Sequence, residues 1–299
     1  MLRVTAALRL LIAILLAQSG DIEPARVVML GSGTPIPDPA SSGPGVAIVV
    51  NDHTYLFDAG AGIVRRAQEA AAKHRIRSLQ APYLNRLFLT HLHSDHTLGY
   101  PDVMLTPWVV GRSEPLEVWG PKGTAAMTDH IRLAWGEDIK LRMEGAEHRP
   151  PLRVNAHEIE GGQVYRDSNI VVRAIPACHG SWPQSFGYAI EAGGRSIVIS
   201  GDTAPCETIT EACQRCDVLV HEVYSAARFA LFPAGAKTYH ATFHTSTREL
   251  AEIASKAKPK LLVLYHQLYF GSRDEVDLEK EVREHYSGAV ISGRDLGVY

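Results

Sequence analysis

The sequence lacks an excess of basic residues. It has 30 Lys and Arg residues against 33 Asp and Glu residues, and a formal net charge of −3 over 299 residues. Proteins that bind nucleic acid depend on Lys and Arg side chains to neutralise phosphates. The charge balance therefore argues against nucleic acid as a partner.

The chain also lacks an apolar run long enough to span a membrane. The run Leu10–Ala17 follows Arg3 and Arg9 and is well short of the roughly 20 residues that a spanning helix needs. Ala17-Gln18-Ser19 fits a small-x-small cleavage site. Residues 1–19 are therefore predicted to be a cleaved signal peptide of a secreted or periplasmic protein with no stable membrane anchor. A lipid-facing anchor is the alternative, and cleavage would take the net charge to −5.

Cysteine is scarce, with four residues that all lie in the second half. A zinc ribbon is disfavoured because Cys213-x-x-Cys216 has no second pair of cysteines to complete four ligands. Cys206, Cys213 and Cys216 are predicted to lie on a helix. Two of these three could form a disulfide in an oxidising compartment, or all could be buried as small apolar side chains. The sequence leaves both alternatives open.

No low-complexity linker divides the chain, so residues 20–299 are expected to form one domain. Apolar runs bounded by Gly, Pro and Asn predict strands at 27–30, 46–50, 55–57, 87–89, 170–175, 188–190, 196–199, 218–220 and 261–264. Helices are predicted at 62–75, 205–214, 246–257 and 275–286. Two strand-rich halves flanked by helices predict an α/β fold with four layers, namely helix, sheet, sheet and helix.

Residues 90–99, Thr-His-Leu-His-Ser-Asp-His-Thr-Leu-Gly, follow directly on a predicted strand and are dense in metal-binding side chains. Four strong ligands within six residues, His91, His93, Asp95 and His96, favour a metal site over a polar loop with incidental histidines. Imidazole and carboxylate ligands suit zinc, and also iron or manganese.

Other polar side chains stand where the later strands stop. The residues that follow these strands include His179, Asp202 and His266. Each alone would more often be a structural residue. Together they can supply the remaining ligands for two metal ions.

With these motifs the chain resembles the metallo-β-lactamase superfamily, in its ribonuclease Z-like branch. The resemblance runs from Gly31-Ser-Gly-Thr-Pro35 and Phe57-Asp-Ala-Gly60 through the histidine-rich motif to His266. It implies the αββα fold in a single domain, and two divalent ions, expected to be zinc with manganese or iron as alternatives. The ligands that it implies are His91, His93 and His179 for one ion, Asp95, His96 and His266 for the other, and Asp202 as the bridge.

The resemblance also implies a mechanism in which a hydroxide held between the two ions attacks an ester. Asp95 could orient or deprotonate the attacking water. Asp58 is expected to lie behind the ligands and to steady a histidine.

A second pair of residues is expected near the leaving group. His221-Glu222-Val-Tyr resembles the His-Glu-Ala-Thr motif of ribonuclease Z-like phosphodiesterases, and Phe243-His-Thr-Ser246 resembles their later histidine motif. The resemblance implies that Glu222 and His244 act together, because a carboxylate that keeps an imidazole protonated makes a general acid and an anion-binding group. His221 is expected to be a buried structural residue. Trp182, close to His179, is the aromatic residue most expected to touch substrate.

One family feature is missing. Ribonuclease Z enzymes that mature transfer RNA carry a long Gly- and Pro-rich arm between the positions of His179 and Asp202, and here that interval has only 22 residues. The predicted function is therefore an exported two-metal hydrolase that cleaves a phosphodiester or a related small ester. An arylsulfatase-like or lactonase activity is the alternative, and a transfer RNA 3′-processing endonuclease is disfavoured.

Other classes fit less well. Many zinc β-lactamases have Cys where this chain has Asp202, and the loop of diiron flavoproteins has Glu where this chain has His93. A metal-binding protein without turnover is disfavoured because every expected ligand is present. The resemblance also implies a homodimer, although no residue pattern in the sequence requires one.

Overall fold

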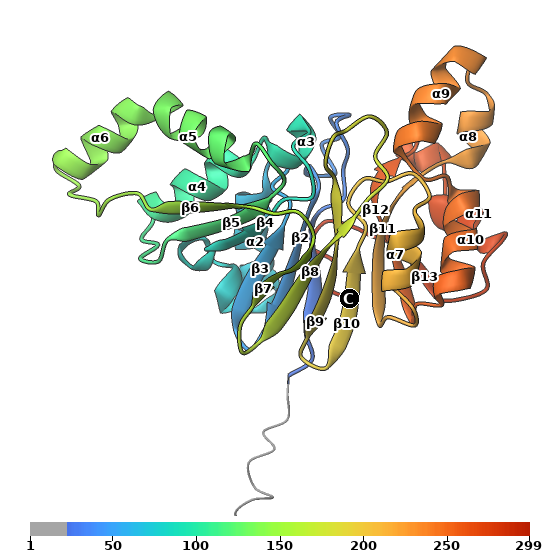
Figure 1. Cartoon of the computed structure of the whole chain (residues 1–299), viewed down its shortest axis with the longest axis horizontal. Helices are drawn as coiled ribbons and strands as arrows, with labels where there is room; N and C mark the ends of the chain where they lie inside the picture. Colours follow the sequence, from blue (N-terminus) through green and yellow to red (C-terminus); the bar gives the residue numbers. More distant parts are fainter. Residues whose placement is uncertain (1–22) are drawn as a thin grey trace, which may run out of the picture.

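Two β-sheets pack face to face, and helices cover their outer faces (Figure 1). The computed structural model describes residues 23–299, so the predicted signal peptide lies outside the described residues. The first sheet has six strands in chain order: β1 (Arg26–Gly31), β2 (Gly45–Val50), β3 (His53–Phe57), β4 (Arg86–Phe88), β5 (Leu116–Gly120) and β6 (Val154–Glu158). This arrangement confirms the predicted single-domain αββα fold.

The second sheet has seven strands in the order β13-β12-β11-β10-β9-β8-β7. Their bounds are β7 (Gly162–Arg166), β8 (Ile170–Pro176), β9 (Phe186–Ala192), β10 (Arg195–Ile199), β11 (Val218–Tyr224), β12 (Leu261–Leu268) and β13 (Val290–Ser292). Strands β10 to β13 run parallel, whereas β7 to β10 pair antiparallel. Asp202 follows β10, and Glu222 and His266 lie near the carboxyl ends of β11 and β12.

The helices belong to the two outer layers and to two excursions from the body. The first sheet is covered by α2 (Ile63–His74) and α4 (Tyr100–Val109), and the second by α7 (Glu207–Ala212), α10 (Thr247–Ala257) and α11 (Leu278–Arg283). The excursions are α5 (Thr124–Ala134) with α6 (Gly136–Glu144), and α8 (Ala226–Ala230) with α9 (Ala234–Phe243) (Figure 1). Four short helices remain: α3 (Ser94–Thr97), η1 (Arg77–Leu79), η2 (Ala81–Tyr83) and η3 (Arg273–Glu275). No helix among residues 23–299 is long and apolar enough to cross a bilayer.

Strand β1 shows why the predicted strands are continuous apolar runs. Val28 and Leu30 pack toward the helices of the first outer layer, and Val27 and Met29 pack between the two sheets. Because side chains alternate along a strand, a strand covered on both faces needs apolar residues at every position.

The ends of the parallel strands meet at one edge of the second sheet. Ile199 of β10 pairs with Val220 of β11, which pairs with Val263 of β12. Asp202, Glu222 and His266 lie two or three residues beyond this row. The register therefore brings their side chains to the same edge.

The interval between His179 and Asp202 contains a short loop and the β9–β10 hairpin. The hairpin turn is Gly193-Gly194, with φ of 51° and 71°, which suits glycine because its lack of a Cβ allows positive φ. A Cβ on Gly193 would lie 2.5 Å from the backbone nitrogen of Ala25, so the turn packs tightly against the start of the described chain. No long arm is present in this interval.

The four cysteines form two disulfides. Cys178 pairs with Cys206, with 5.6 Å between their Cα atoms, and Cys213 pairs with Cys216, with 4.8 Å. The prediction that Cys206, Cys213 and Cys216 lie on a helix is wrong, because α7 is shorter than expected and Cys206 and Cys213 flank it as its caps. The sequence prediction did not consider Cys178 as a partner.

Candidate metal centre

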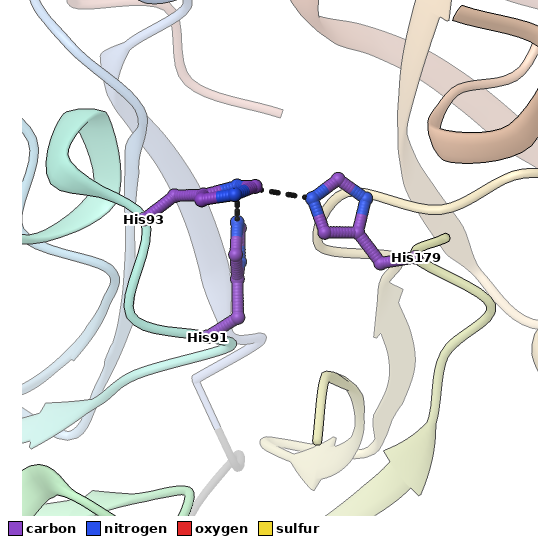
Figure 2. Close-up of side chains that lie close together, drawn as sticks. All are labelled: His91, His93 and His179. Atoms are coloured by element: carbon purple, nitrogen blue, oxygen red, sulfur yellow. Dashed lines mark hydrogen bonds between the residues drawn. The ribbon is translucent and has the colours of Figure 1, made fainter. Parts of the chain in front are cut away.

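Three histidine rings converge between the ends of the two sheets (Figure 2). Nδ1 of His93 lies 3.0 Å from Nε2 of His91 and 3.1 Å from Nε2 of His179. Metal–nitrogen distances of about 2.0–2.1 Å around one tetrahedral ion would place neighbouring ligand atoms roughly 3.3 Å apart. The three nitrogens are therefore spaced to share one ion, and the family resemblance implies the same three ligands.

The segment that carries His91 is fixed by Asp58. The backbone nitrogen of Thr90, which follows β4, donates to Oδ1 of Asp58 at 2.8 Å, and Nδ1 of His96 lies 2.8 Å from Oδ2. Asp58 itself has a φ of 62°, an uncommon conformation for a residue other than glycine. This carboxylate orients the His96 ring from behind, which is the position expected from the sequence.

A second group of four side chains lies beside the first: Asp95, His96, Asp202 and His266. Nε2 of His96 is 3.3 Å from Asp202 Oδ1 and 3.5 Å from Asp95 Oδ2. Nε2 of His266 is 3.2 Å from Asp95 Oδ2 and 3.3 Å from Asp202 Oδ2. His266 has a φ of 43°, and strained backbone of this kind is common at functional sites.

Buried polar atoms of this group have no hydrogen-bond partner. His96 Nε2 and Asp202 Oδ1 are inaccessible to solvent and unpaired, although such atoms normally find a partner. A cation between them would satisfy both. Asp202 also lies within ligand distance of His179 in the first group, so its carboxylate faces both candidate positions. The seven residues thus fit two divalent ions with Asp202 between them.

The charge state of the histidines depends on burial and on the carboxylates. Burial lowers the pKa of His91 well below its usual value and the pKa of His179 to about 4, which keeps both rings neutral as metal ligands must be. Burial alone would lower the pKa of His96 as well, but the carboxylates of Asp202 and Asp58 raise it well above the usual value. A cation would take the place of the proton that these carboxylates attract.

Glu222 and His244 form the predicted pair at the rim of the centre. Nδ1 of His244 lies 3.0 Å from Oε1 of Glu222, which also accepts a hydrogen bond from the backbone nitrogen of Thr203 at 2.8 Å. Burial alone would lower the pKa of His244, but the charge and hydrogen bond of Glu222 raise it to about 9. The ring of His244 stacks on His266 with centroids 5.7 Å apart, so a cationic imidazole stands next to the candidate ligands.

Two other histidines, His221 and His240, lie near the Glu222–His244 pair. His221 is fully buried, and its Nδ1 lies 2.7 Å from the backbone oxygen of Glu222, as expected for a structural residue. His240 belongs to α9 and packs against Phe270 with ring centroids 4.6 Å apart. Its ring is 6.0 Å from that of His244.

Aromatic side chains lie next to the histidines of the first group. The ring of Trp182 lies 4.2 Å from that of His93, and the ring of Phe243 lies 5.0 Å from that of His179. Tyr239, which is half exposed, stacks on Phe243 with ring centroids 4.6 Å apart. Aromatic rings therefore lie beside two of the three histidines of the first group.

Sequence reasoning missed the contacts that hold the loop of His179. Gly180 has a φ of 56°, and a Cβ there would lie 2.3 Å from the ring of Phe243. Cys178, on the other side of His179, is bonded to Cys206. Position next to a ligand was the one signal in the sequence that could have marked Cys178.

A family model and a curated relative match most of the chain. The model of the β-lactamase superfamily domain matches residues 53–267. Ribonuclease Z of Mycobacterium bovis BCG is 31% identical over 276 residues, which cover 91% of this chain and 96% of the relative.

Three solved structures share the fold. The metallo-β-lactamase fold protein YhfI from Bacillus subtilis has a TM-score of 0.69 at 18% identity, covering 93% of this chain and all of that one. The short form of human tRNase Z has a TM-score of 0.66 at 23% identity, covering 92% and 98%. A diphosphatase of the PhnP family has a TM-score of 0.61 at 17% identity, covering 92% and 97%.

Proposed function

This chain belongs to the metallo-β-lactamase superfamily, in its ribonuclease Z-like part, and on this premise we propose that it hydrolyses small phosphodiesters that carry a planar group. It is a metal-dependent hydrolase, and its ribonuclease Z relatives act on phosphoester bonds. We propose that its metal ions are zinc. Two divalent ions at the seven ligand residues would polarise the phosphoryl group and lower the pKa of a water molecule.

The observation that carries the proposal is the contact between Glu222 and His244. A phosphodiester carries a negative charge, and its leaving group departs as an alkoxide or phenolate. A protonated imidazole beside the centre can both bind the anion and protonate the leaving oxygen. Glu222 keeps that imidazole protonated at neutral pH, because the pKa of His244 is raised to about 9. His244 is thus placed to bind the anion and to donate a proton to the leaving oxygen.

Asp95 is proposed to orient the attacking water. Its carboxylate is largely buried and lies 3.2 Å from Nε2 of His266. Burial alone would raise its pKa, but the hydrogen bond from His266 and the neighbouring His96 lower it. Asp95 is therefore ionised at neutral pH and can accept a hydrogen bond from a water molecule.

Transfer RNA processing is the second candidate, and the name of the curated relative favours it. Three observations support a smaller substrate. The interval between His179 and Asp202 holds a two-stranded hairpin instead of an arm. The chain carries a net negative charge. The aromatic rings of Trp182 and Phe243 lie close enough to the centre to contact a single planar group.

One panel of substrates tests both candidates. We would load the purified chain with zinc and measure hydrolysis of bis(p-nitrophenyl) phosphate, p-nitrophenyl sulfate, a simple lactone and a precursor transfer RNA with a 3′ trailer, with His91→Ala as the control. Diester cleavage that depends on His91 and exceeds cleavage of the RNA would support the proposal. Preference for the sulfate or the lactone would overturn the substrate class, and efficient trimming of the RNA would make the second candidate correct.

We also propose that the protein is exported, with residues 1–19 as its signal peptide. The two disulfides support this proposal, because disulfides persist in oxidising compartments and are rare in the cytosol. Fractionation of cells that produce the full chain, with the mass of the mature protein, tests it. Full-length protein in the cytosolic fraction would contradict export.

A further inference from the structure

The Cys178–Cys206 disulfide joins the two loops that carry ligands to the metal centre. Cys178 directly precedes His179, and Cys206 lies four residues after Asp202. We propose that Cys178 and Cys206 are positioning residues, whose disulfide holds His179 and Asp202 at ligand distance, so that reduction weakens metal binding. This inference deepens the proposed function, because it makes the activity of the same site dependent on redox conditions.

The two loops already touch at their backbones. The backbone nitrogen of Cys178 donates to Oγ1 of Thr203 at 3.0 Å, and the nitrogen of Ala204 donates to the oxygen of Cys178 at 2.8 Å. Thr203 in turn donates from its backbone nitrogen to Glu222. The disulfide therefore closes a set of contacts that includes a ligand loop, the candidate bridge and the acid pair.

The His179 ring has few other restraints. Outside the candidate ligands its one hydrogen bond joins Nδ1 to the backbone oxygen of Phe243 at 2.9 Å. Phe243 ends α9, a helix in one of the two excursions from the body. Without the disulfide, the contact between the His179 loop and the Asp202 loop would depend on the two backbone hydrogen bonds of Cys178.

A reductant can reach the bond. Cys178 is exposed, although Cys206 is buried. A dithiol would transfer two electrons and two protons to the disulfide, leaving two cysteine thiols and its own cyclic disulfide. Reoxidation by a disulfide would reverse the step.

The second disulfide provides a matched control. Cys213 and Cys216 are three residues apart, at the end of α7, and both are buried in the outer helical layer against residues such as Leu250. Neither residue contacts a candidate ligand. A Cys213→Ser/Cys216→Ser variant therefore removes a disulfide without loosening a ligand loop.

The test compares this control with a Cys178→Ser/Cys206→Ser variant. The dissociation constant for zinc is measured by competition with a chromophoric chelator, and the visible spectrum is measured after cobalt substitution. We expect zinc to bind about 10- to 100-fold more weakly to the Cys178→Ser/Cys206→Ser variant, as is usual when a support of a ligand is lost. The cobalt spectrum should also change, and the control should differ from the unaltered chain by less than about twofold.

A second test uses the folded control variant, so it does not depend on whether the Cys178→Ser/Cys206→Ser variant folds. In this background Cys178–Cys206 is the only disulfide, so treatment with tris(2-carboxyethyl)phosphine, which is oxidised to its phosphine oxide with oxygen from water, should weaken zinc binding by the same factor. Reoxidation should restore it. Unchanged zinc affinity after mass spectrometry has verified reduction would overturn the inference. These measurements use no substrate, so a failure of the proposed diester hydrolysis would be seen separately.

Discussion

Asp58 shows how a residue that is not an expected ligand shapes the centre. Its two carboxylate oxygens hold Thr90 and His96 from behind. We expect Asp58→Asn to weaken zinc binding about 10- to 100-fold, because the amide cannot accept from both partners and the charge that supports His96 is lost. Asn tolerates the positive φ of this position, so the backbone should be preserved.

Asp52→Asn is the matched control for this experiment. Asp52 also has a positive φ, of 54°, and accepts a hydrogen bond from the backbone of Ser78. Its carboxylate makes no contact with the metal centre. Equal zinc affinity in the Asp58→Asn and Asp52→Asn variants, by competition titration, would show that Asp58 does not support the centre.

The pH dependence of hydrolysis is expected to report His244. Its raised pKa of about 9 means that the imidazole is charged at neutral pH and loses its proton as the pH rises through that value. The rate constant kcat should therefore fall above about pH 9. His244→Gln should remove this alkaline limb.

The leaving group provides a second readout of the same residue. An alkoxide needs a proton more than p-nitrophenolate does, so His244→Gln should slow an alkyl diester by about 10²- to 10⁴-fold and an aryl diester by much less. Equal losses on both substrates would indicate that His244 binds the anion without donating a proton.

At the level of single residues, the sequence predicted the candidate ligands that stand in a dense motif or at the end of a strand. His91 and His93 stand in a motif too dense in ligands to be incidental, and the register of parallel strands places Asp202 and His266 at one edge. The disulfide of Cys178 could not be predicted in the same way. Its partner is 28 residues away, on the other side of the β9–β10 hairpin.

Among the elements, α10 begins with a capping box that directly follows the His244 segment. The side chain of Ser246 accepts from the backbone of Glu249, and Glu249 accepts from the backbone of Ser246. We expect Ser246→Ala to lower the free energy of unfolding by about 1 kcal/mol and the melting temperature by about 2–4 °C. Thermal denaturation followed by circular dichroism measures the effect.

Ser255→Ala, in the same helix, is the control for the cap. Ser255 is exposed and bonds to the oxygen of Ala251 within the helix, an interaction that contributes little to stability. This variant should melt within about 1 °C of the unaltered chain. If the Ser246→Ala and Ser255→Ala variants have the same melting temperature, the capping box does not stabilise α10.

The sequence prediction missed four strands, namely β5, β6, β7 and β13. β6 is an edge strand of sequence Val-Asn-Ala-His-Glu with no fully buried side chain, so it lacks the apolar run on which the prediction relied. β13 is only three residues long. In contrast, β11 and β12 are buried along most of their length and were predicted from their cores, Val218–Val220 and Leu261–Leu264. β5 is also largely buried and was missed, because Glu117 interrupts its apolar run.

For the whole molecule, metal removal is expected to lower stability. Ions that bind only the folded chain stabilise it by about 2.7 kcal/mol when their concentration is 100 times the dissociation constant. Dialysis against a chelator should therefore lower the melting temperature, and added zinc should restore it. The variant His91→Ala should respond less to zinc, and identical melting with and without metal would argue against a metal centre.

The layered architecture could be predicted from the composition and the apolar pattern of the sequence, whereas the oligomeric state could not. Apolar strands flanked by helices require covered faces, which predicts four layers without knowledge of any contact. The homodimer implied by the family resemblance stays a prediction, because no feature of residues 23–299 tests it. Light scattering of the purified chain would measure the molecular mass in solution.

The candidate ligands come from both sides of the connection between β6 and β7. His91 and Asp95 precede this connection, and His179 and His266 follow it. A chain cut at Gly161 would give two fragments, and neither would hold a complete set of ligands for either ion. Metal binding would then add to the apolar contacts between the two sheets in holding the fragments together, which makes this connection a natural place to divide the protein into a two-part zinc sensor.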